Sequence, residues 1–586
     1  MSQAIIEWVS GPVVRARPEG PFVLREAVRV GERGLLGEVI RIKESEIVVQ
    51  VYEDTTGIRP GIRIEGNGQL LSVRLGPGIL GGIFDGLLRP IADISVDGPW
   101  VKPGTIEHPA ADFYFIPQVA EGETLAAGSI IGRVKPGKGR EQRILVPPGV
   151  SGVVEELVPE GEYQDDAPLC QLRDKKDVRR PVSMSHLWSV RRPRPVAARL
   201  PSDEPMLTGQ RIIDCLFPVA KGGKAAIPGG FGTGKTVLLE TLAKWCNADV
   251  IVYVGCGERG NELAGLLKEF AELEDPRTGR LLLERTVLIA NTSNMPVAAR
   301  EASIYTGVTV AEYFRDQGFD VALMADSTSR WAEALREVSG RLGELPGEAG
   351  YPAYLSSRLA DFYERAAKVK TLAGETGSVT LMGAVSPPSG DLSEPVTSHT
   401  RRYIRSFWTL DTHRAHARFY PAIHPLHSYS TDAALLARWW QAEGCTHWQE
   451  LRTRFLTLLD EQARLERMAR IIGKDAMPPR QRFTLMCAEL LNEGFLRQSA
   501  YSEVDRSASP ARQAVMMRII GEFIEQAERV VAGGVLPEAI SRLPVFRRLM
   551  RMSEEIPEGQ WEEFTELSDA LDKSMVELAE SSQQEA

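Results

Sequence analysis

The chain has 586 residues, too many for one hydrophobic core, so about three or four domains are expected. Apolar residues make up 43% and charged residues 25%, as in ordinary soluble globular proteins, and no run approaches the roughly eighteen apolar residues of a membrane span. The net charge of −10 disfavours nucleic acid as the main partner. The six cysteines are scattered without metal or redox spacing, which favours a reduced, cytoplasmic setting over a disulfide framework.

The first 200 residues predict two β modules. Residues 1–75 contain β-branched runs at 39–42 and 47–52, separated by short polar turns, and predict an N-terminal β-barrel. Residues 76–110 are interpreted as a linker to the core. Residues 111–200 repeat Gly- and Pro-rich turns between short strands and predict an inserted β-rich domain. Arginines at 179, 180, 191, 192 and 194 form a basic cluster there, which we interpret as a solvated linker, with an anion site as the alternative.

Residues 201–430 predict a nucleotide-binding core, and residues 431–586 predict a helical domain. In the core, apolar runs at 250–254, 286–290 and 321–325 alternate with helical segments, which is typical of a parallel sheet buried on both faces. Beyond residue 431 the apolar residues recur at helical spacing, for example from Met516 to Val530. The expected fold class is therefore multidomain α/β.

The most informative motif is a phosphate-binding loop, G-x-x-x-x-G-K-[ST], at residues 229–236. Its glycines let the backbone curl around phosphates, and its N–H groups and the following helix favour an anion. Lys235 is expected to reach the β and γ phosphates, and the Thr236 hydroxyl to ligate Mg²⁺. A chance glycine turn and a dinucleotide-binding fingerprint through Gly230, Gly232 and Gly234 are the alternatives; the Gly-Lys-Thr ending argues against the latter.

Hydrolysis also needs a carboxylate for the metal and a group that positions water. Asp326 directly follows a predicted buried strand, so its carboxylate is expected at the edge of the sheet beside the phosphate loop, acting on Mg²⁺ through water; an N-cap is the alternative. Glu258 follows another such strand and is the candidate for orienting the attacking water. Glu262, one helical turn further on, is its rival. Arg259 is interpreted as pairing with a carboxylate or contacting phosphate.

Two further features lie between residues 411 and 427. His413, His416, His424 and His427 suggest a test for a structural metal, which we do not expect because prolines separate the pairs and acidic ligands are scarce. Tyr420 precedes a proline, so its ring could face an adenine, with core packing as the equal alternative.

Several motifs occur in an order that resembles the catalytic A subunit of the vacuolar/archaeal-type rotary ATPase. They are the phosphate loop, Gly-Glu-Arg at 257–259, Asn-Thr-Ser-Asn-Met-Pro at 291–296, Ala-Asp-Ser-Thr-Ser-Arg-Trp at 325–331, and Ser-Pro-Pro at 386–388. Ile-Phe-Asp-Gly at 83–86 and the β-rich insertion, which is similar to the bulge domain of that family, also fit. The resemblance covers essentially the whole chain and implies a RecA-like P-loop core.

The resemblance also implies the functional residues. Lys235 and Glu258 would be catalytic, with Arg259 beside them, and Thr236 and Asp326 would serve the metal. The nucleotide-binding set would be Gly229, Gly230, Phe231, Gly232, Thr233, Gly234, Lys235, Thr236, Val237, Tyr420, Gln498 and Tyr501. One departure stands out: the family has Pro-Pro-Gly-Gly-Asp where this chain has Ser389 in place of the first glycine, which puts the conformation of that loop in question.

The resemblance further implies partners and a place in the cell. Three such chains would alternate with three B-type subunits, each supplying an arginine finger, and stalk subunits would connect the ring to a membrane sector that moves H⁺ or Na⁺. The complex would lie at the cytoplasmic face of a membrane and use ATP, ADP and phosphate. A regulatory subunit without turnover and a ring translocase for protein or RNA are the rival functions. The intact Lys235, Glu258 and Asp326 argue against the first, and the acidic charge and the insertion argue against the second.

Overall fold

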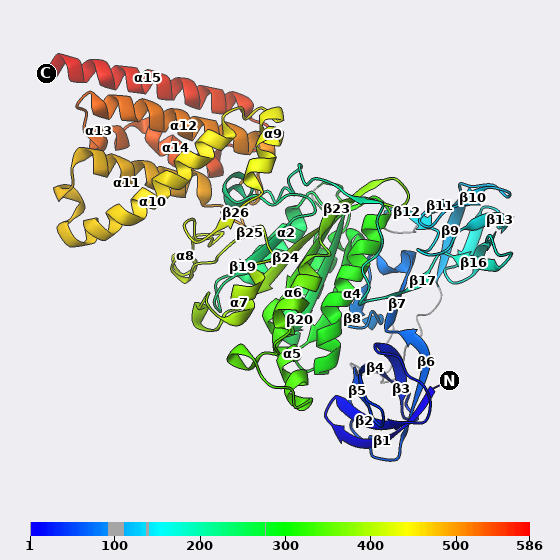
Figure 1. The fold of residues 1–586 in the computed structure, drawn as a ribbon. Helices are drawn as coiled ribbons and strands as arrows, with labels where there is room; N and C mark the ends of the chain where they lie inside the picture. Colours follow the sequence, from blue (N-terminus) through cyan, green and yellow to red (C-terminus); the bar gives the residue numbers. More distant parts are fainter. Residues whose placement is uncertain (1, 92–110, 136–139, 276, 586) are drawn as a thin grey trace. The chain divides into compact units, whose positions relative to one another are not determined.

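The computed structural model describes residues 2–91, 111–135, 140–275 and 277–585 (Figure 1). The chain divides into two compact units, each built from two stretches of sequence. Unit 1 comprises Met1–Pro201 and Ala248–Ile404, and unit 2 comprises Ser202–Asn247 and Arg405–Ala586. The predicted linker at 76–110 lies outside the described residues from residue 92 onward.

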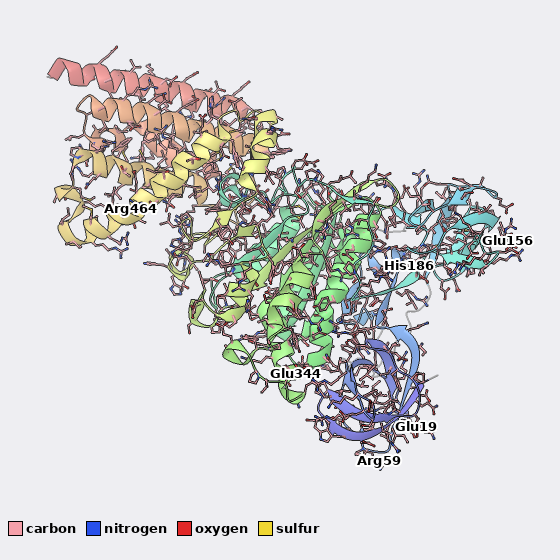
Figure 2. The ribbon with its side chains drawn as sticks, viewed as in Figure 1. Glu19, Arg59, Glu156, His186, Glu344 and Arg464 are labelled. Carbon is pink, nitrogen blue, oxygen red and sulfur yellow. The ribbon has the colours of Figure 1, made fainter. Side chains whose placement is uncertain are left out.

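Unit 1 begins with a closed antiparallel barrel in the strand order β1-β2-β5-β4-β3-β6. Every other side chain of a strand points inward, so residues such as Ile6, Val28 and Val49 are buried in one apolar cluster. Figure 2 shows charged side chains such as Glu19 and Arg59 on the outside of the barrel. The strands are β1 (Ser2–Ser10), β2 (Val13–Pro18), β3 (Glu26–Val30), β4 (Leu35–Ile42), β5 (Ile47–Val51) and β6 (Arg63–Leu70).

The inserted domain of unit 1 consists of two four-stranded sheets in the orders β10-β13-β15-β16 and β12-β11-β9-β14. Their facing side chains, including Phe115, Val134 and Leu172, form a separate core. The strands are β9 (Asp112–Pro117), β10 (Thr124–Leu125), β11 (Ile130–Lys135), β12 (Gln142–Leu145), β13 (Gly152–Leu157), β14 (Gly161–Gln164), β15 (Pro168–Arg173) and β16 (Arg179–Ser183). An antiparallel ribbon of β7 (Ser72–Leu75) and β17 (His186–Ser189) follows at the edge of this module.

A parallel sheet in the order β24-β22-β20-β21-β8 forms the rest of unit 1. Its central strands are buried along nearly their whole length, which explains their continuous apolar sequence. The strands are β8 (Ile83–Asp85), β20 (Val250–Glu258), β21 (Thr286–Thr292), β22 (Asp320–Asp326) and β24 (Thr376–Val385). Antiparallel β23 (Ala367–Lys370) extends the sheet beyond β24 and pairs with β18 (Ala198–Arg199).

Helices cover this sheet, and α4 (Val297–Asp316) is buried along most of its length (Figure 1). It is one of the helical segments expected between the apolar runs of the core. In the described residues of unit 1, the other helices are α3 (Gly260–Glu272), α5 (Thr328–Arg341), α6 (Leu355–Tyr363) and α7 (Pro395–Thr400), with short turns η1 (Pro77–Ile79), η4 (Leu282–Arg285), η5 (Glu348–Gly350) and η6 (Pro388–Gly390).

Arg194 of the basic cluster is buried against α4 and Arg191 is largely buried beside it, so the interpretation as a solvated linker is wrong for these two. Arg191 donates to Glu301 on α4 over 2.7 Å and to Glu38 on β4 over 3.1 Å. Arg194 donates to Asp316 over 2.6 Å and is 4% exposed. Carboxylates of the barrel and of α4 converge on this segment, and a buried guanidinium is tolerated because it is paired.

Unit 2 contains three short strands, β19 (Lys224–Pro228), β25 (Ser406–Phe407) and β26 (Tyr429–Ser430), with β19 and β25 parallel. Helix α2 (Lys235–Trp245) follows β19. The remaining helices are η3 (Ile212–Leu216), α8 (Thr412–His416), α9 (Ala433–Ala442), α10 (Trp448–Ile472), η7 (Lys474–Ala476), α11 (Pro479–Leu491), η8 (Asn492–Leu496), α12 (Pro510–Ala532), α13 (Pro537–Ser541), α14 (Pro544–Glu555) and α15 (Trp561–Glu585).

The carboxy-terminal helices pack as a bundle, drawn in yellow to red in Figure 1. The apolar residues predicted to share a helix face between Met516 and Val530 are buried on α12. On α10 the buried residues are concentrated in the first half, around Phe455 and Leu458, whereas Ile472 at its end is 49% exposed.

Candidate nucleotide and catalytic sites

The phosphate loop joins β19 to α2 within unit 2. Gly232 and Gly234 have φ values of 76° and 84°, a region that residues with a Cβ adopt only with strain. The Lys235 ammonium donates to the carbonyl oxygens of Gly229 over 2.7 Å and Gly230 over 2.8 Å. The positive charge is therefore held within the curl of the loop, and Thr236 lies in the first turn of α2.

Other residues of the predicted set flank the loop. Thr233 is buried, and its hydroxyl donates to the Gly230 carbonyl over 2.8 Å. Phe231 is 86% exposed and Val237 is exposed on α2, so both offer apolar surface beside the loop. These contacts describe a preformed turn whose backbone and cation suit a polyphosphate.

Tyr420 and Gln498, predicted for the adenine side, lie together in unit 2. The Gln498 backbone N–H donates to the Tyr420 carbonyl over 2.7 Å, and the Tyr420 hydroxyl donates to Thr241 on α2 over 2.8 Å. Burial raises the pKa of Tyr420. Tyr501, three residues after Gln498, is 96% exposed. The structure therefore connects Tyr420 to the helix that begins in the phosphate loop.

The Gln498 side chain binds backbone groups of the segment before η3. Its Oε1 accepts from the Arg211 backbone N–H over 2.9 Å, and its Nε2 donates to the Gly209 carbonyl over 2.8 Å. Sequence reasoning missed Arg211, which is fully buried. A single arginine directly before the apolar pair Ile212–Ile213 was the signal that could have identified it.

Glu258 and Asp326 lie at the carboxyl ends of neighbouring parallel strands in unit 1. The register places Gly255 of β20 opposite Asp326 of β22, and Glu258 is the last residue of β20. Asp326 is 2% exposed, and its Oδ2 accepts from the Tyr253 hydroxyl over 3.3 Å. Ser327, not Asp326, is the N-cap residue of α5, so the capping alternative does not account for this carboxylate.

Burial, then the charge of Asp326 and a hydrogen bond with Glu262, raise the pKa of Glu258 to about 8. Glu262 lies in the first turn of α3 and is also 3.7 Å from Arg259 in an exposed ion pair. Exposed pairs of this kind contribute little to stability. The rivals Glu258 and Glu262 are therefore neighbours, and Glu258 is the one that ends a strand adjacent to the strand of Asp326.

The four histidines do not gather around a common point for a metal. In the parts of the chain that the structure describes, no three His, Cys, Asp or Glu side chains are placed to hold a metal ion among themselves. The rings of His424 and His427 stack at 4.0 Å, and Nδ1 of His424 accepts from the backbone N–H groups of Leu426 and His427.

Ser389 occupies the position of the missing glycine with a left-handed backbone. Its φ and ψ are 53° and 17°, so the turn keeps a positive φ although the residue carries a Cβ. Asp391, two residues on, accepts from the backbone N–H and the hydroxyl of Ser393, over 2.9 and 2.7 Å. The substitution leaves the turn in the conformation that a glycine would favour.

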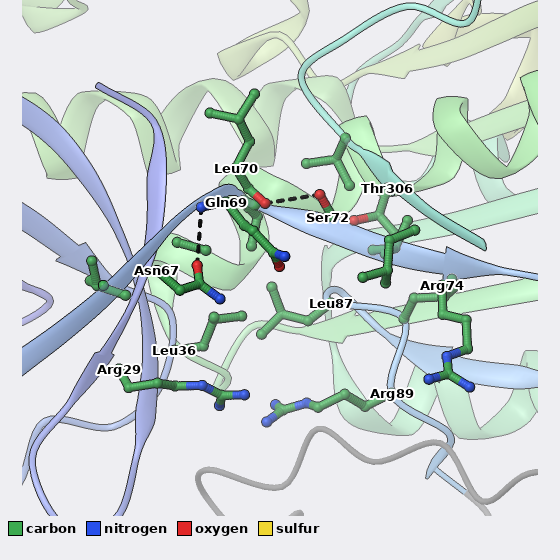
Figure 3. Close-up of a pocket in the computed structure, with 18 of the residues that line it drawn as sticks. Arg29, Leu36, Asn67, Gln69, Leu70, Ser72, Arg74, Leu87, Arg89 and Thr306 are labelled. Atoms are coloured by element: carbon green, nitrogen blue, oxygen red, sulfur yellow. Dashed lines mark hydrogen bonds between the residues drawn. The ribbon is translucent and has the colours of Figure 1, made fainter. Parts of the chain in front are cut away.

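A cavity of about 720 Å³ lies elsewhere in unit 1, between the barrel, the β7–β17 ribbon and α4 (Figure 3). Arg29, Arg74 and Arg89 line it together with apolar side chains such as Leu36 and Leu87. Its walls contain none of the predicted nucleotide or catalytic residues, so we do not assign this cavity as the catalytic site.

Comparison with known proteins identifies the class. The ATP synthase alpha/beta family matches over its beta-barrel domain at 6–68, its barrel-sandwich domain at 108–191 and its nucleotide-binding domain at 209–430. The C-terminal domain of V and A type ATP synthase matches at 437–540. The chain belongs to the ATP synthase alpha/beta family, so the predicted fold class is confirmed.

Two relatives show which member of the family it resembles. The A subunit of the A-type ATP synthase of Methanopyrus kandleri is 49% identical over 98% of both chains, and the V-type ATP synthase alpha chain of Halothermothrix orenii is 47% identical over 99% of both. The chain is thus a catalytic A-type member of the V/A rotary ATPases, and the predicted family, enzyme class and function are confirmed.

A solved structure shares the fold. The assembled ATPase EscN from the type III secretion system of enteropathogenic E. coli is similar with a TM-score of 0.63, over 88% of this chain and 99% of that one. At 23% identity this likeness extends to the fold alone. In the described residues, no helix has both the length and the hydropathy to cross a membrane.

Proposed function

We propose that Lys235 of the phosphate loop and Glu258 of the parallel sheet act on one bound ATP, which the chain hydrolyses or forms while the complex moves ions. The observation that carries the proposal is the placement of Glu258 and Asp326 at the ends of adjacent strands, in a chain whose phosphate loop keeps both its lysine and its threonine. Rotary coupling itself follows from membership of the family.

The chain's own residues account for most of the chemistry. The loop N–H groups and Lys235 hold the β and γ phosphates, and Tyr420 offers its ring to the base. The Glu258 carboxylate accepts a hydrogen bond from a water whose oxygen attacks the γ phosphorus, while the bond from that phosphorus to the bridging oxygen of ADP breaks. A raised pKa makes the Glu258 carboxylate a stronger base once it is ionised, and a cation bound beside Asp326 would favour that ionised form.

The residues fit Mg²⁺. The Thr236 hydroxyl and the Asp326 carboxylate are hard oxygen donors, and Asp326 and Glu258 end adjacent parallel strands, which brings two acidic side chains to one edge of the sheet. The chemistry that Mg²⁺ supplies when bound is neutralisation of charge on the phosphates. Thr236 would bind it directly and Asp326 through water.

We infer the partners from the family. B-type subunits would alternate with this chain in a six-membered ring and each supply an arginine finger, which stabilises charge on the transferred phosphoryl group only when the interface closes. Central and peripheral stalk subunits would connect the ring to a membrane sector, at the cytoplasmic face of the membrane. Arg259, exposed beside Glu262, would act near the phosphates or the interface.

The test is purification of the native complex from membranes, with identification of its subunits and an ATP-dependent ion-flux assay in vesicles. Co-purification of a B-type subunit and ATP-driven flux is the expected result. A chain that co-purifies with secreted proteins or RNA, or that binds ATP in a complex with no turnover, would overturn the proposal in favour of a translocase or a regulatory subunit.

A further inference from the structure

A buried arginine fastens the segment that carries Gln498 and Tyr501. We call residues 495–505 the strap; from residue 497 onward it contains no helix or strand. Arg211 donates to the Phe495 carbonyl through Nε over 2.5 Å and to the Arg497 carbonyl through Nη2 over 2.7 Å. Its Nη1 pairs with Asp505 over 2.5 Å, and both side chains are almost fully buried. One side chain thus holds both ends of the strap.

Neighbours of Arg211 add to this fastening. Gln210 donates through Nε2 to the Arg506 carbonyl over 3.0 Å, and the Gly209 carbonyl accepts from the Ala508 backbone N–H over 3.0 Å. Asp505 also accepts from the Ser499 backbone N–H over 3.1 Å, which closes the strap on itself. The strap therefore takes its conformation mainly from residues 209–211, because it has no regular backbone ladder of its own.

The strap contacts Tyr420, the residue whose ring is predicted to face the base. Between its two ends the Gln498 N–H donates to the Tyr420 carbonyl, and Tyr420 in turn reaches Thr241 on α2. Tyr501 projects from the strap, almost fully exposed. All these residues belong to unit 2, as does the phosphate loop. A shift of the strap would change the surroundings of the base while leaving the loop intact.

We propose that Arg211 is a positioning residue for the nucleotide base, acting through the strap on Tyr420, Gln498 and Tyr501. The inference rests on the proposed function, because it takes these three residues as the base side of the site. Arg211 would thus control the part of the nucleotide affinity that depends on the base, although its side chain contacts the strap and not the base. The phosphate-dependent part belongs to the loop.

The chemistry of the side chain explains why lysine is no substitute. Arg211 uses Nε and both Nη atoms on three partners in a fixed plane, whereas an ammonium offers one compact donor group that cannot reach all three. Arg211→Lys keeps the charge opposite Asp505 but releases at least one end of the strap. Asp505→Asn is the milder variant, since it keeps the oxygen acceptor and removes the charge.

The experiment measures, by calorimetry on the full chain, the affinities for Mg-ATP and for magnesium tripolyphosphate, which has the phosphates without the base. Stacking contacts of a base are typically worth about fivefold to a hundredfold in affinity. We expect Arg211→Lys to weaken ATP binding about tenfold and to leave tripolyphosphate binding within about twofold, with a smaller shift of the same sign for Asp505→Asn. Arg365→Lys is the matched control, because Arg365 is also a buried, carboxylate-paired arginine but lies in unit 1.

The outcomes separate the inference from the proposed function. If both strap variants leave the ratio of the ATP affinity to the tripolyphosphate affinity unchanged, the positioning role is overturned. A change in that ratio in Arg365→Lys as well would also overturn it. If Arg211→Lys does not fold, Asp505→Asn decides between these results. A wild-type chain that binds neither ligand would instead refute the proposed nucleotide site.

Discussion

Acidification should destabilise unit 1 through one partly buried histidine, His186. His186 on β17 is labelled in Figure 2, and its Nε2 lies 2.9 Å from Nη1 of Arg194. Arginine can only donate, so the imidazole nitrogen must accept and the ring must be neutral. Burial, with the Arg194 charge as a second cause, lowers the pKa of His186 to about 3. Tyr313 of α4 packs edge-on against the ring.

The direction and size of this pH effect follow from the difference between the pKa of His186 in the folded chain and its pKa in the unfolded chain. In the unfolded chain His186 takes up a proton below its ordinary pKa of about 6.5, whereas in the folded chain it resists protonation down to about 3. The contribution of His186 to the free energy of unfolding is therefore fully present above pH 6.5, and it is lost as the pH falls towards 3. Between pH 7 and pH 5 the loss from this one group is about 2 kcal/mol of the free energy of unfolding.

The assay compares urea unfolding of the wild type and of His186→Gln at pH 7 and pH 5. Glutamine is neutral at both pH values and can accept from Arg194, so the variant should lose about 2 kcal/mol less on acidification than the wild type. Other titrating groups contribute equally to both proteins and cancel in this difference. An identical loss in the two proteins would refute the reasoning, because His186 would then be able to bind a proton in the folded chain.

Two further predictions concern the loops. Ser389→Gly should stabilise unit 1 by about 0.5–1 kcal/mol in denaturant unfolding, because the turn already has a positive φ that costs serine more than glycine; a destabilised variant would show that the Ser389 side chain contributes more than its backbone strain. Lys235→Ala should weaken Mg-ATP binding at least about tenfold in calorimetry on the isolated chain, because the loop loses its cation; unchanged affinity would contradict the assignment of residues 229–236 to phosphate binding.

Local patterns were enough to predict the main elements of the site. Gly-Lys-Thr after an apolar strand predicted the loop and its helix, and the polar residues that end apolar runs predicted Glu258 and Asp326 at a sheet edge. Those signals are local because a glycine turn and a buried strand depend on a few neighbouring residues. The family resemblance supplied Gln498 and Tyr501, which residue type alone would not have singled out.

Features that depend on distant residues were not predictable. The register that places Gly255 opposite Asp326 arises from packing of the whole sheet. The role of Arg211 depends on carbonyl groups nearly three hundred residues away. Arg191 and Arg194 are removed from solvent because carboxylates of the barrel and of α4 pair with them. These carboxylates are distant in the sequence, so the basic run alone indicated a solvated segment. The roles of the site residues and the domain boundaries stay predictions.

The central claim is that Glu258 serves turnover while Lys235 serves binding. The most direct measurement is steady-state ATP hydrolysis by the assembled complex carrying Glu258→Gln, with Mg-ATP binding measured on the same preparation. The expected result is near-normal binding and a rate at least about a hundredfold lower, the effect typical of a lost general base. Full turnover by the Glu258→Gln complex would contradict the account.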